Sequence, residues 1–176
     1  MSYRIEMATE EDIEQIVNTT KYYYKSFDCS YGFLLGYTTK EKLYNNLNSF
    51  YVIKEDNLYA GHVRISFGTP PEFGELSFYN QEIKNKIMEE KAIYIEHIVI
   101  DAPHVGKGLG GKLFDYLYEK HPDYHFMSSV VVQPYKNNCS LHFHRKNGFV
   151  DVAYYYNDVI GNKRYESIYL LREKCI

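Results

Sequence analysis

Residues 94–111 constrain this chain of 176 residues more than any other segment, because an apolar strand pattern runs directly into a glycine-rich loop. The segment reads Tyr-Ile-Glu-His-Ile-Val-Ile-Asp-Ala-Pro-His-Val-Gly-Lys-Gly-Leu-Gly-Gly, and a helical pattern follows it. Glycine leaves the backbone open to a ligand, and a helix start carries unpaired N–H groups and the positive end of the helix dipole. We therefore expect a strand–loop–helix unit that binds a phosphorylated cofactor.

The composition is that of a globular protein and excludes several classes of partner. With 45% hydrophobic and 24% charged residues and a formal net charge of -3, nothing favours nucleic acid or an anionic membrane. No long apolar run predicts a membrane span, and Cys29, Cys139 and Cys175 have no spacing typical of a disulfide framework or a metal site. We expect residues 1–176 to form a single domain that is soluble, cytoplasmic and free of bound metal.

Hydrophobic periodicity predicts a mixed α/β domain of about seven strands flanked by helices. The predicted strands cover residues 3–7, 50–54, 58–67, 92–100, 124–132, 150–157 and 163–171. Helices are expected after a capping pair Thr9 and Asp12, after a second pair Thr38 and Glu41, and at 79–90, 109–117 and 138–147. The order strand, helix, strand over residues 92–132 predicts parallel pairing at the centre of the sheet.

The glycine spacing in residues 106–113 is compatible with more than one type of phosphate loop. A dinucleotide fingerprint needs an acidic residue about 20 positions further on, where this chain has Val131, Val132 and Gln133. A nucleotide-binding P-loop needs a hydroxyl to hold Mg²⁺ at the position of Leu113. A glycine turn without a ligand is the remaining alternative, so the spacing by itself does not decide between them.

A second motif makes the pattern more specific. Asn137-x-x-Ser140-x-x-Phe143-His144 precedes Gly148-Phe149 and follows the loop after one further strand. Over residues 93–149 this pairing resembles the Gcn5-related N-acetyltransferase (GNAT) superfamily. The resemblance implies a GNAT-like mixed central sheet, splayed between the fourth and fifth strands, and acetyl-CoA as co-substrate.

The resemblance also implies roles for individual residues. The backbone of Ile98, Val99 and Ile100 would pair with the pantetheine arm of the cofactor as an added strand would. Asn137 and Ser140 would bind the same arm. The pyrophosphate would lie on the loop, which consists of Val105, Gly106, Lys107, Gly108, Leu109, Gly110 and Gly111. Val105 departs from the family, which commonly has Arg or Gln there, and Lys107 and Lys112 are near enough to compensate.

Acetyl transfer requires a neutral amine. At pH 7, removing the proton from an amine with a pKa of about 10.4 costs roughly 4 to 5 kcal/mol. Glu96 is the candidate base, because it is a carboxylate in an otherwise apolar strand and diamine acetyltransferases of the superfamily have a similar Tyr-x-Glu. A paired structural carboxylate is the alternative. His144 stands where the family has a Tyr as general acid, and an imidazolium is available near neutral pH. A histidine without a role, or a phenol such as Tyr135, remains open.

The acceptor is not specified by any motif. Glu72, Glu75 and Glu82 in an inserted segment, with the tyrosines of residues 22–37, favour a small cationic or aromatic amine. A protein amino group is the alternative acceptor, and pairing into a homodimer is common in the family. Because Val105 and His144 both depart from the pattern, a catalytically inactive acetyl-CoA-binding sensor is the competing function, followed by a P-loop-like nucleotide-binding protein.

Overall fold

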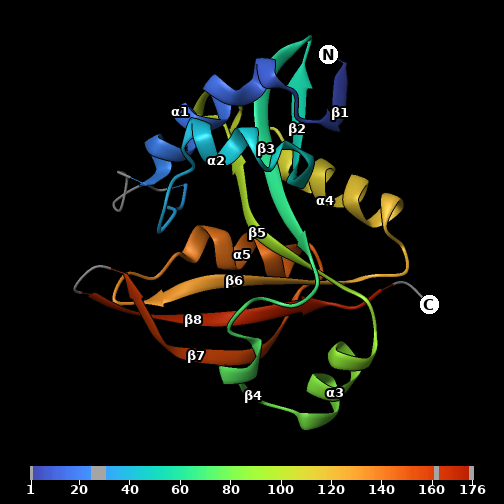
Figure 1. Cartoon of the computed structure of the whole chain (residues 1–176), viewed down its shortest axis with the longest axis vertical. Coiled ribbons are helices and arrows are strands. Elements are labelled where there is room, and N and C mark those ends of the chain that lie inside the picture. The colour runs from blue at the N-terminus through green and yellow to red at the C-terminus, as the bar shows by residue number, and fades with distance from the viewer. Residues whose placement is uncertain (1, 25–30, 161–162, 175–176) are drawn as a thin grey trace. The chain divides into compact units, whose positions relative to one another are not determined.

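The computed structural model describes residues 2–24, 31–160 and 163–174. Within them, eight strands form one sheet in the order β1-β2-β3-β5-β6-β8-β7-β4 (Figure 1). The strands are β1 (Tyr3–Met7), β2 (Phe50–Glu55), β3 (Leu58–Phe67), β4 (Ser77–Phe78), β5 (Ala92–Ile100), β6 (His125–Gln133), β7 (Val150–Ile160) and β8 (Lys163–Arg172). The predicted mixed α/β sheet is confirmed, and the strand missed by the prediction is β4, which is too short to show an alternating pattern.

Five α-helices occur in the described part of the chain, with short 3-10 helices between other elements. They are α1 (Ile13–Tyr24), α2 (Lys40–Tyr44), α3 (Gln81–Glu89), α4 (Leu109–Lys120) and α5 (Asn138–Lys146). By its contacts the chain divides into two compact units. The first comprises Met1–Ile65 and His97–Lys120, and the second comprises Ser66–Glu96 and His121–Ile176. Strand β5 is divided between them after Glu96.

The first unit is organised around the antiparallel strands β1, β2 and β3. The β2–β3 hairpin turns at Asp56 and Asn57, whose positive φ angles of 48° and 71° make a tight turn. Alternate residues of β2 face opposite sides of the sheet. Phe50 and Val52 pack with the buried residues of α1 and α2, which include Ile13, Ile16, Val17 and Leu43. On the other side, the rings of Tyr51 and Tyr116 lie 5.6 Å apart, so α4 covers that face.

The caps of the first two helices were predicted with different success. The backbone N–H of Thr9 donates to Asp12 Oδ2 at 2.9 Å, which confirms the first capping box. The second cap is Thr39, whose side chain accepts from the N–H of Lys42, and the prediction of Thr38 is wrong by one residue. Thr38 is buried and its own N–H donates to Thr20 Oγ1 at 3.3 Å, so it serves the contact with α1 instead.

The second unit contains β6, β7 and β8 with α3 and α5. Strand β6 pairs antiparallel with β8, which forms a hairpin with β7, and β4 pairs with β7 at the sheet edge. The buried core of this unit consists of Phe73, Leu76, Ile87, Ala92, Tyr94, Met127, Val152, Ala153, Tyr169 and Leu171. The predicted parallel pairing of β5 with β6, the fourth and fifth predicted strands, is confirmed from Ala92↔His125 to Ile95↔Ser128, where its register ends.

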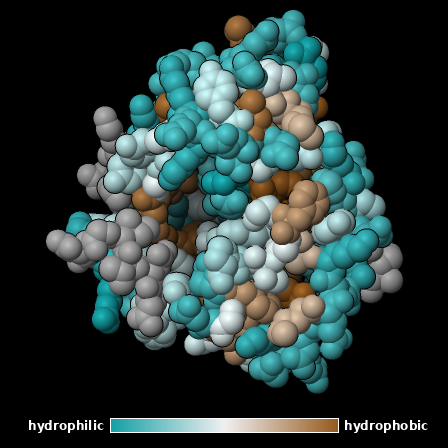
Figure 2. Space-filling view, in the orientation of Figure 1, coloured by the Kyte–Doolittle hydropathy of each residue, from teal (hydrophilic) through white to brown (hydrophobic). Residues whose placement is uncertain are grey.

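Hydrophilic residues dominate the face of the molecule seen in Figure 2, and hydrophobic residues show there as separate patches. Among the residues that the structure describes, none of the helices combines the length and the apolar composition that a membrane crossing requires.

Candidate functional site

The loop before α4 depends on two glycines in a left-handed backbone conformation. Gly106 has a φ angle of 84° and Gly108 one of 77°. A Cβ atom at either position would meet no atom within 4 Å, so conformation rather than crowding requires glycine here. A 3-10 helix ends at His104 and α4 begins at Leu109, which confirms the predicted helix start on the glycine loop.

Backbone donors converge at the start of α4. The N–H of Lys112 donates to the carbonyl of Gly108 at 3.3 Å and closes the first turn. Helix geometry leaves the preceding N–H groups, those of Leu109, Gly110 and Gly111, without a partner inside the helix, and the helix dipole makes this end positive. Gly106, Lys107 and Gly108 are exposed. The loop therefore presents an accessible backbone surface suited to an anionic group.

The last residues of β5 present only some of their backbone groups to a ligand. The N–H of Asp101 donates to Ala60 in β3 at 2.9 Å, and a Cβ on Gly61 of the same strand would come within 2.6 Å of the Val99 carbonyl. Because backbone groups alternate along a strand, Val99 faces β3, whereas Ile98 and Ile100 face the opposite edge. Of the three residues predicted to pair with pantetheine, these two have the required direction.

Tyr23 of α1, one of the tyrosines of the predicted aromatic cluster, reaches this edge, and sequence patterns did not predict this contact. Its hydroxyl donates to the carbonyl of Ile100 at 2.7 Å, and its side chain is buried. A carbonyl oxygen has two lone pairs, so this bond leaves Ile100 able to accept from a second donor.

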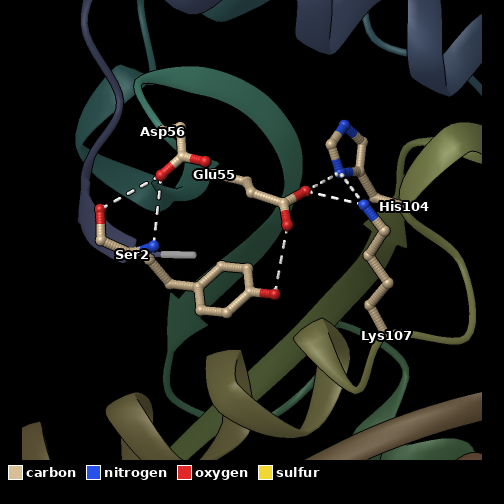
Figure 3. A network of polar contacts seen from close by, with 6 residues as sticks. Ser2, Glu55, Asp56, His104 and Lys107 are labelled. Atoms are coloured by element: carbon tan, nitrogen blue, oxygen red, sulfur yellow. Dashed lines mark hydrogen bonds and ion pairs between the residues drawn. The ribbon is translucent and has the colours of Figure 1, made fainter.

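Figure 3 shows a buried carboxylate, Glu55, at the end of β2 and beside the glycine loop. Its Oε2 accepts from His104 Nδ1 at 2.7 Å and from Lys107 Nζ at 2.8 Å, while Tyr3 donates to Oε1 at 3.3 Å. The hydrogen bond from Lys107, opposed by burial and assisted by His104, lowers the pKa of Glu55. Lys107 was predicted to assist the pyrophosphate contact, and here its ammonium is paired with Glu55. The ammonium of Lys112 lies 5.1 Å from the centroid of the Tyr3 ring.

Glu96 follows directly after the last paired residues of β5 and β6, Ile95 and Ser128. Its side chain is half-buried. Tyr94 lies on the same face of β5, two residues earlier, and its hydroxyl bonds Ser129 Oγ at 2.9 Å. Burial, with smaller effects from the charges of Glu72 and Glu96, raises the pKa of Tyr94 to about 12. Glu96 thus lies beside a buried phenol that stays protonated at neutral pH.

Asn137, Ser140 and His144 are connected along α5 by hydrogen bonds. Asn137 is the N-cap, and its Oδ1 accepts from the N–H of Ser140 at 3.2 Å. His144 Nδ1 donates to the carbonyl of Ser140 at 2.8 Å, and the His144 ring packs edge-on against Phe143 and Phe149. The motif therefore has a clear structural purpose in starting α5 and filling the space beneath it.

His144 does not have the protonation state that was expected of it. Only 2% of this residue is exposed, and burial, partly offset by the hydrogen bond to Ser140, lowers its pKa to about 4. The prediction of an imidazolium near neutral pH is wrong, because the ring lies among aromatic side chains that cannot solvate a charge. At pH 7 the neutral ring carries its proton on Nδ1.

Comparison with family models decides the classification. The model of the acetyltransferase (GNAT) family matches residues 11–149, which span both the glycine loop and the α5 motif. The chain belongs to the GNAT family. It is accordingly an acyl-transferring enzyme. A search among curated proteins found no significant match.

Solved structures agree with this GNAT fold. NAA60 from Arabidopsis thaliana, in complex with a bisubstrate analogue, superposes with a TM-score of 0.69 at 12% identity, covering 97% of each chain. The ribosomal-protein-alanine N-acetyltransferase from Brucella melitensis has a TM-score of 0.67 at 13% identity, covering 96% of this chain and 98% of that one. An N-acetyltransferase from Staphylococcus aureus Mu50 has a TM-score of 0.66 at 15% identity, covering 98% and 99%.

This GNAT protein also contains a close histidine pair, the buried His62 and the half-buried His97, that the sequence patterns did not reveal. His62 Nε2 and His97 Nε2 lie 3.0 Å apart, and the Tyr59 hydroxyl lies 2.5 Å from His62 Nδ1. Burial lowers the pKa of His62 well below its usual value and that of His97 to about 3. The one signal in the sequence was a histidine in each of two largely apolar strands, β3 and β5.

Carboxylate–tyrosine pairs surround the core of the second unit. The hydroxyls of Tyr169, Tyr155 and Tyr154 donate to Glu72, Glu75 and Glu166, respectively. Two of these carboxylates, Glu72 and Glu75, were predicted to favour a cationic acceptor. The third predicted carboxylate, Glu82, is exposed in the first turn of α3. Of the predicted aromatic cluster, Tyr22, Tyr31 and Tyr37 are exposed, and residues 25–30 lie outside the described part of the chain.

Proposed function

We propose that this GNAT enzyme transfers the acetyl group of acetyl-CoA directly to a small cationic or aromatic amine. The observation that carries the proposal is the loop of Gly106 and Gly108, which exposes a backbone surface at the N-terminus of α4. Such a surface favours a diphosphate, because several N–H groups and the helix dipole act on the same anion. Naa50 from Arabidopsis thaliana, which has a similar fold, was solved in complex with the bisubstrate analogue CoA-Ac-MVNAL, and CoA carries such a diphosphate.

Two segments of the chain would hold acetyl-CoA. The loop from Val105 to Gly111 would bind the pyrophosphate through its N–H groups, and the free edge of β5 at Ile98 and Ile100 would pair with the pantetheine amides. Asn137 and Ser140, which bond each other at the start of α5, would bind the same pantetheine arm. When bound, acetyl-CoA supplies an acetyl thioester to the site.

Glu96 would act as the base that makes the acceptor amine nucleophilic. A half-buried carboxylate at the point where β5 leaves its register with β6 can accept a proton from an ammonium group held nearby. The neutral amine then forms the new carbon–nitrogen bond while the carbon–sulfur bond breaks, and the proton that the nitrogen loses neutralises the released thiolate. Releasing the thiolate costs only about 2 kcal/mol at pH 7, so a general acid contributes less than the base. This balance is compatible with a neutral His144.

The acidic surroundings of Tyr94 support an acceptor that carries a positive charge. Glu72 and Glu96 both act on this tyrosine, and Glu75 and Glu166 are held by neighbouring tyrosines of the same unit. Carboxylates and aromatic rings together favour a cationic amine.

The test measures thiol release from acetyl-CoA with a panel of diamines, aromatic amines and short peptides. Glu96→Gln should lower kcat by about 10²-fold or more for the best amine, because general base catalysis typically contributes that factor. The defect should shrink as the pH approaches about 10, where the amine loses its proton unaided. Glu89→Gln, which changes an exposed carboxylate of α3 that has no proposed role, is the control and should leave kcat unchanged.

Three results would contradict this proposal in distinguishable ways. An unchanged rate and pH profile in Glu96→Gln would remove the base assignment. Release with peptides but with no small amine would shift the acceptor to a protein amino group. Calorimetric binding of acetyl-CoA without transfer to any acceptor would support the sensor instead.

A further inference from the structure

The glycine loop is tied to the rest of the first unit through one carboxylate. Glu55 is 7% exposed and lies at the last position of β2, while its partners His104 and Lys107 flank the left-handed Gly106 from either side. His104 ends the 3-10 helix before the loop, and Lys107 lies between the two loop glycines. Both bond the same oxygen, Oε2, at 2.7 and 2.8 Å. The carboxylate therefore links the two sides of the loop to the end of β2 (Figure 3).

A loop of this composition needs such a restraint. Glycine loses more conformational freedom on ordering than any other residue. Gly106 and Gly108 have no side chains whose packing could offset this loss of entropy. The exposure of both glycines means that few apolar contacts hold the segment. A ligand that binds a disordered loop must also provide the free energy that orders it, so a loop ordered in advance binds more tightly.

The anchor of this restraint is itself rigid. Glu55 belongs to a strand paired with β1 on one side and β3 on the other, through Tyr3↔Glu55 and Glu55↔Leu58. Tyr3 donates to the second carboxylate oxygen, which fixes the plane of the carboxylate. A hydrogen bond to a charged group is stronger than one between neutral groups, and this carboxylate accepts from an ammonium group.

We propose that Glu55 is a positioning residue that holds the loop from His104 to Gly108 in its cofactor-ready conformation before the cofactor arrives. This proposal rests on the proposed binding of acetyl-CoA to the loop. Glu55 acts through His104 and Lys107, and it does not touch the reacting atoms. The expected consequence is an effect on the KM for acetyl-CoA, with little effect on kcat once the cofactor is bound.

A first experiment needs no cofactor and compares amide hydrogen exchange in the free wild-type protein, Glu55→Gln and Glu6→Gln. Glu6 is the matched control, because it pairs with two cations, Arg4 and Lys54, at 2.9 and 3.0 Å. We expect faster exchange in residues 104–111 of Glu55→Gln only. Equal protection of the loop in all three proteins would overturn the proposal.

A second experiment measures steady-state kinetics and calorimetric binding of CoA. Glu55→Ala should raise the KM for acetyl-CoA about tenfold, the factor that corresponds to roughly 1.4 kcal/mol, with kcat changed less than about twofold. Glu55→Gln, which keeps an acceptor oxygen but no charge, should lie between wild type and Glu55→Ala. In a Lys107→Met background the effect of Glu55→Ala should shrink, since partners in one network are not additive.

A change of KM in the opposite direction would contradict the proposal. A lower KM in Glu55→Gln would mean that the carboxylate repels the anionic cofactor rather than preparing its site, and it would overturn the proposal. If wild-type protein neither binds CoA nor releases thiol, the proposed function fails, and the exchange experiment still decides whether Glu55 orders the loop.

Discussion

Buried neutral histidines should make this protein lose stability in mild acid. His62 and His144 are 0% and 2% exposed, and His97 is half-buried beside His62. Burial lowers the pKa of all three below the ordinary value of 6.5. The unfolded chain therefore binds protons that the folded chain does not, so the stabilising effect is complete above pH 6.5 and decreases as the pH falls toward the folded pKa values.

The magnitude follows from the size of the shift. For His144, with a folded pKa of about 4, lowering the pH from 7.5 to 5.0 should cost about 2 kcal/mol, since each pH unit below 6.5 is worth about 1.4 kcal/mol per proton. The coupled His62–His97 pair acts in the same direction and should contribute at least one further proton, for a total of about 4 kcal/mol. A domain of typical stability has about 5–15 kcal/mol, so the loss is large.

Urea unfolding, followed by circular dichroism at several pH values from 7.5 to 5.0, measures this loss. The carboxylates whose pKa is lowered, such as Glu55 and Glu90, lose their contribution only below pH 4.5, outside this range. His144→Gln should reduce the slope of the unfolding free energy against pH by about 1.4 kcal/mol per unit. His142→Gln, at an exposed position of the same helix, is the control and should not change it. A free energy of unfolding that stays constant between pH 7.5 and 5.0 would refute the reasoning.

Two further substitutions test the packing around β5. Gly61→Ala would place a Cβ atom within 2.6 Å of the Val99 carbonyl and should destabilise the protein by about 2 kcal/mol or more. Gly36→Ala is the control and should be nearly neutral, because Gly36 has open space around it. Thermal unfolding of both variants measures the difference. Tyr23→Phe removes the hydrogen bond to Ile100 and should cost about 1 kcal/mol in urea unfolding, and an unchanged midpoint would show that the bond contributes nothing.

The parts of the site that sequence patterns predicted are those whose geometry is local. Gly106 and Gly108 adopt positive φ angles, and α4 begins directly after them, because glycine and the following apolar residues act over a few positions. Thr9 and Asp12 cap α1 for the same reason. The neighbouring prediction of Thr38 failed by one residue because Thr20, on another helix, bonds its backbone.

The partners of the charged site residues could not be predicted in this way. Lys107 was expected to support an anionic ligand, yet its ammonium pairs with Glu55. Glu55 is the last residue of β2, and it lies beside the loop only in the folded chain. His144 was expected to be charged, but the packing of Phe143 and Phe149 around it keeps it neutral. The contact between His62 and His97 likewise joins two strands that are distant in sequence.

The sequence alone determined the α/β class, the strand–loop–helix unit and the family, because hydrophobic periodicity and short motifs depend on neighbouring residues. Only the tertiary structure decided which ion pair Lys107 makes, which histidines stay neutral and which edge of β5 is available. Those properties depend on burial and on distances between residues far apart in the chain, and a desolvated charge or a paired carboxylate has no local signature.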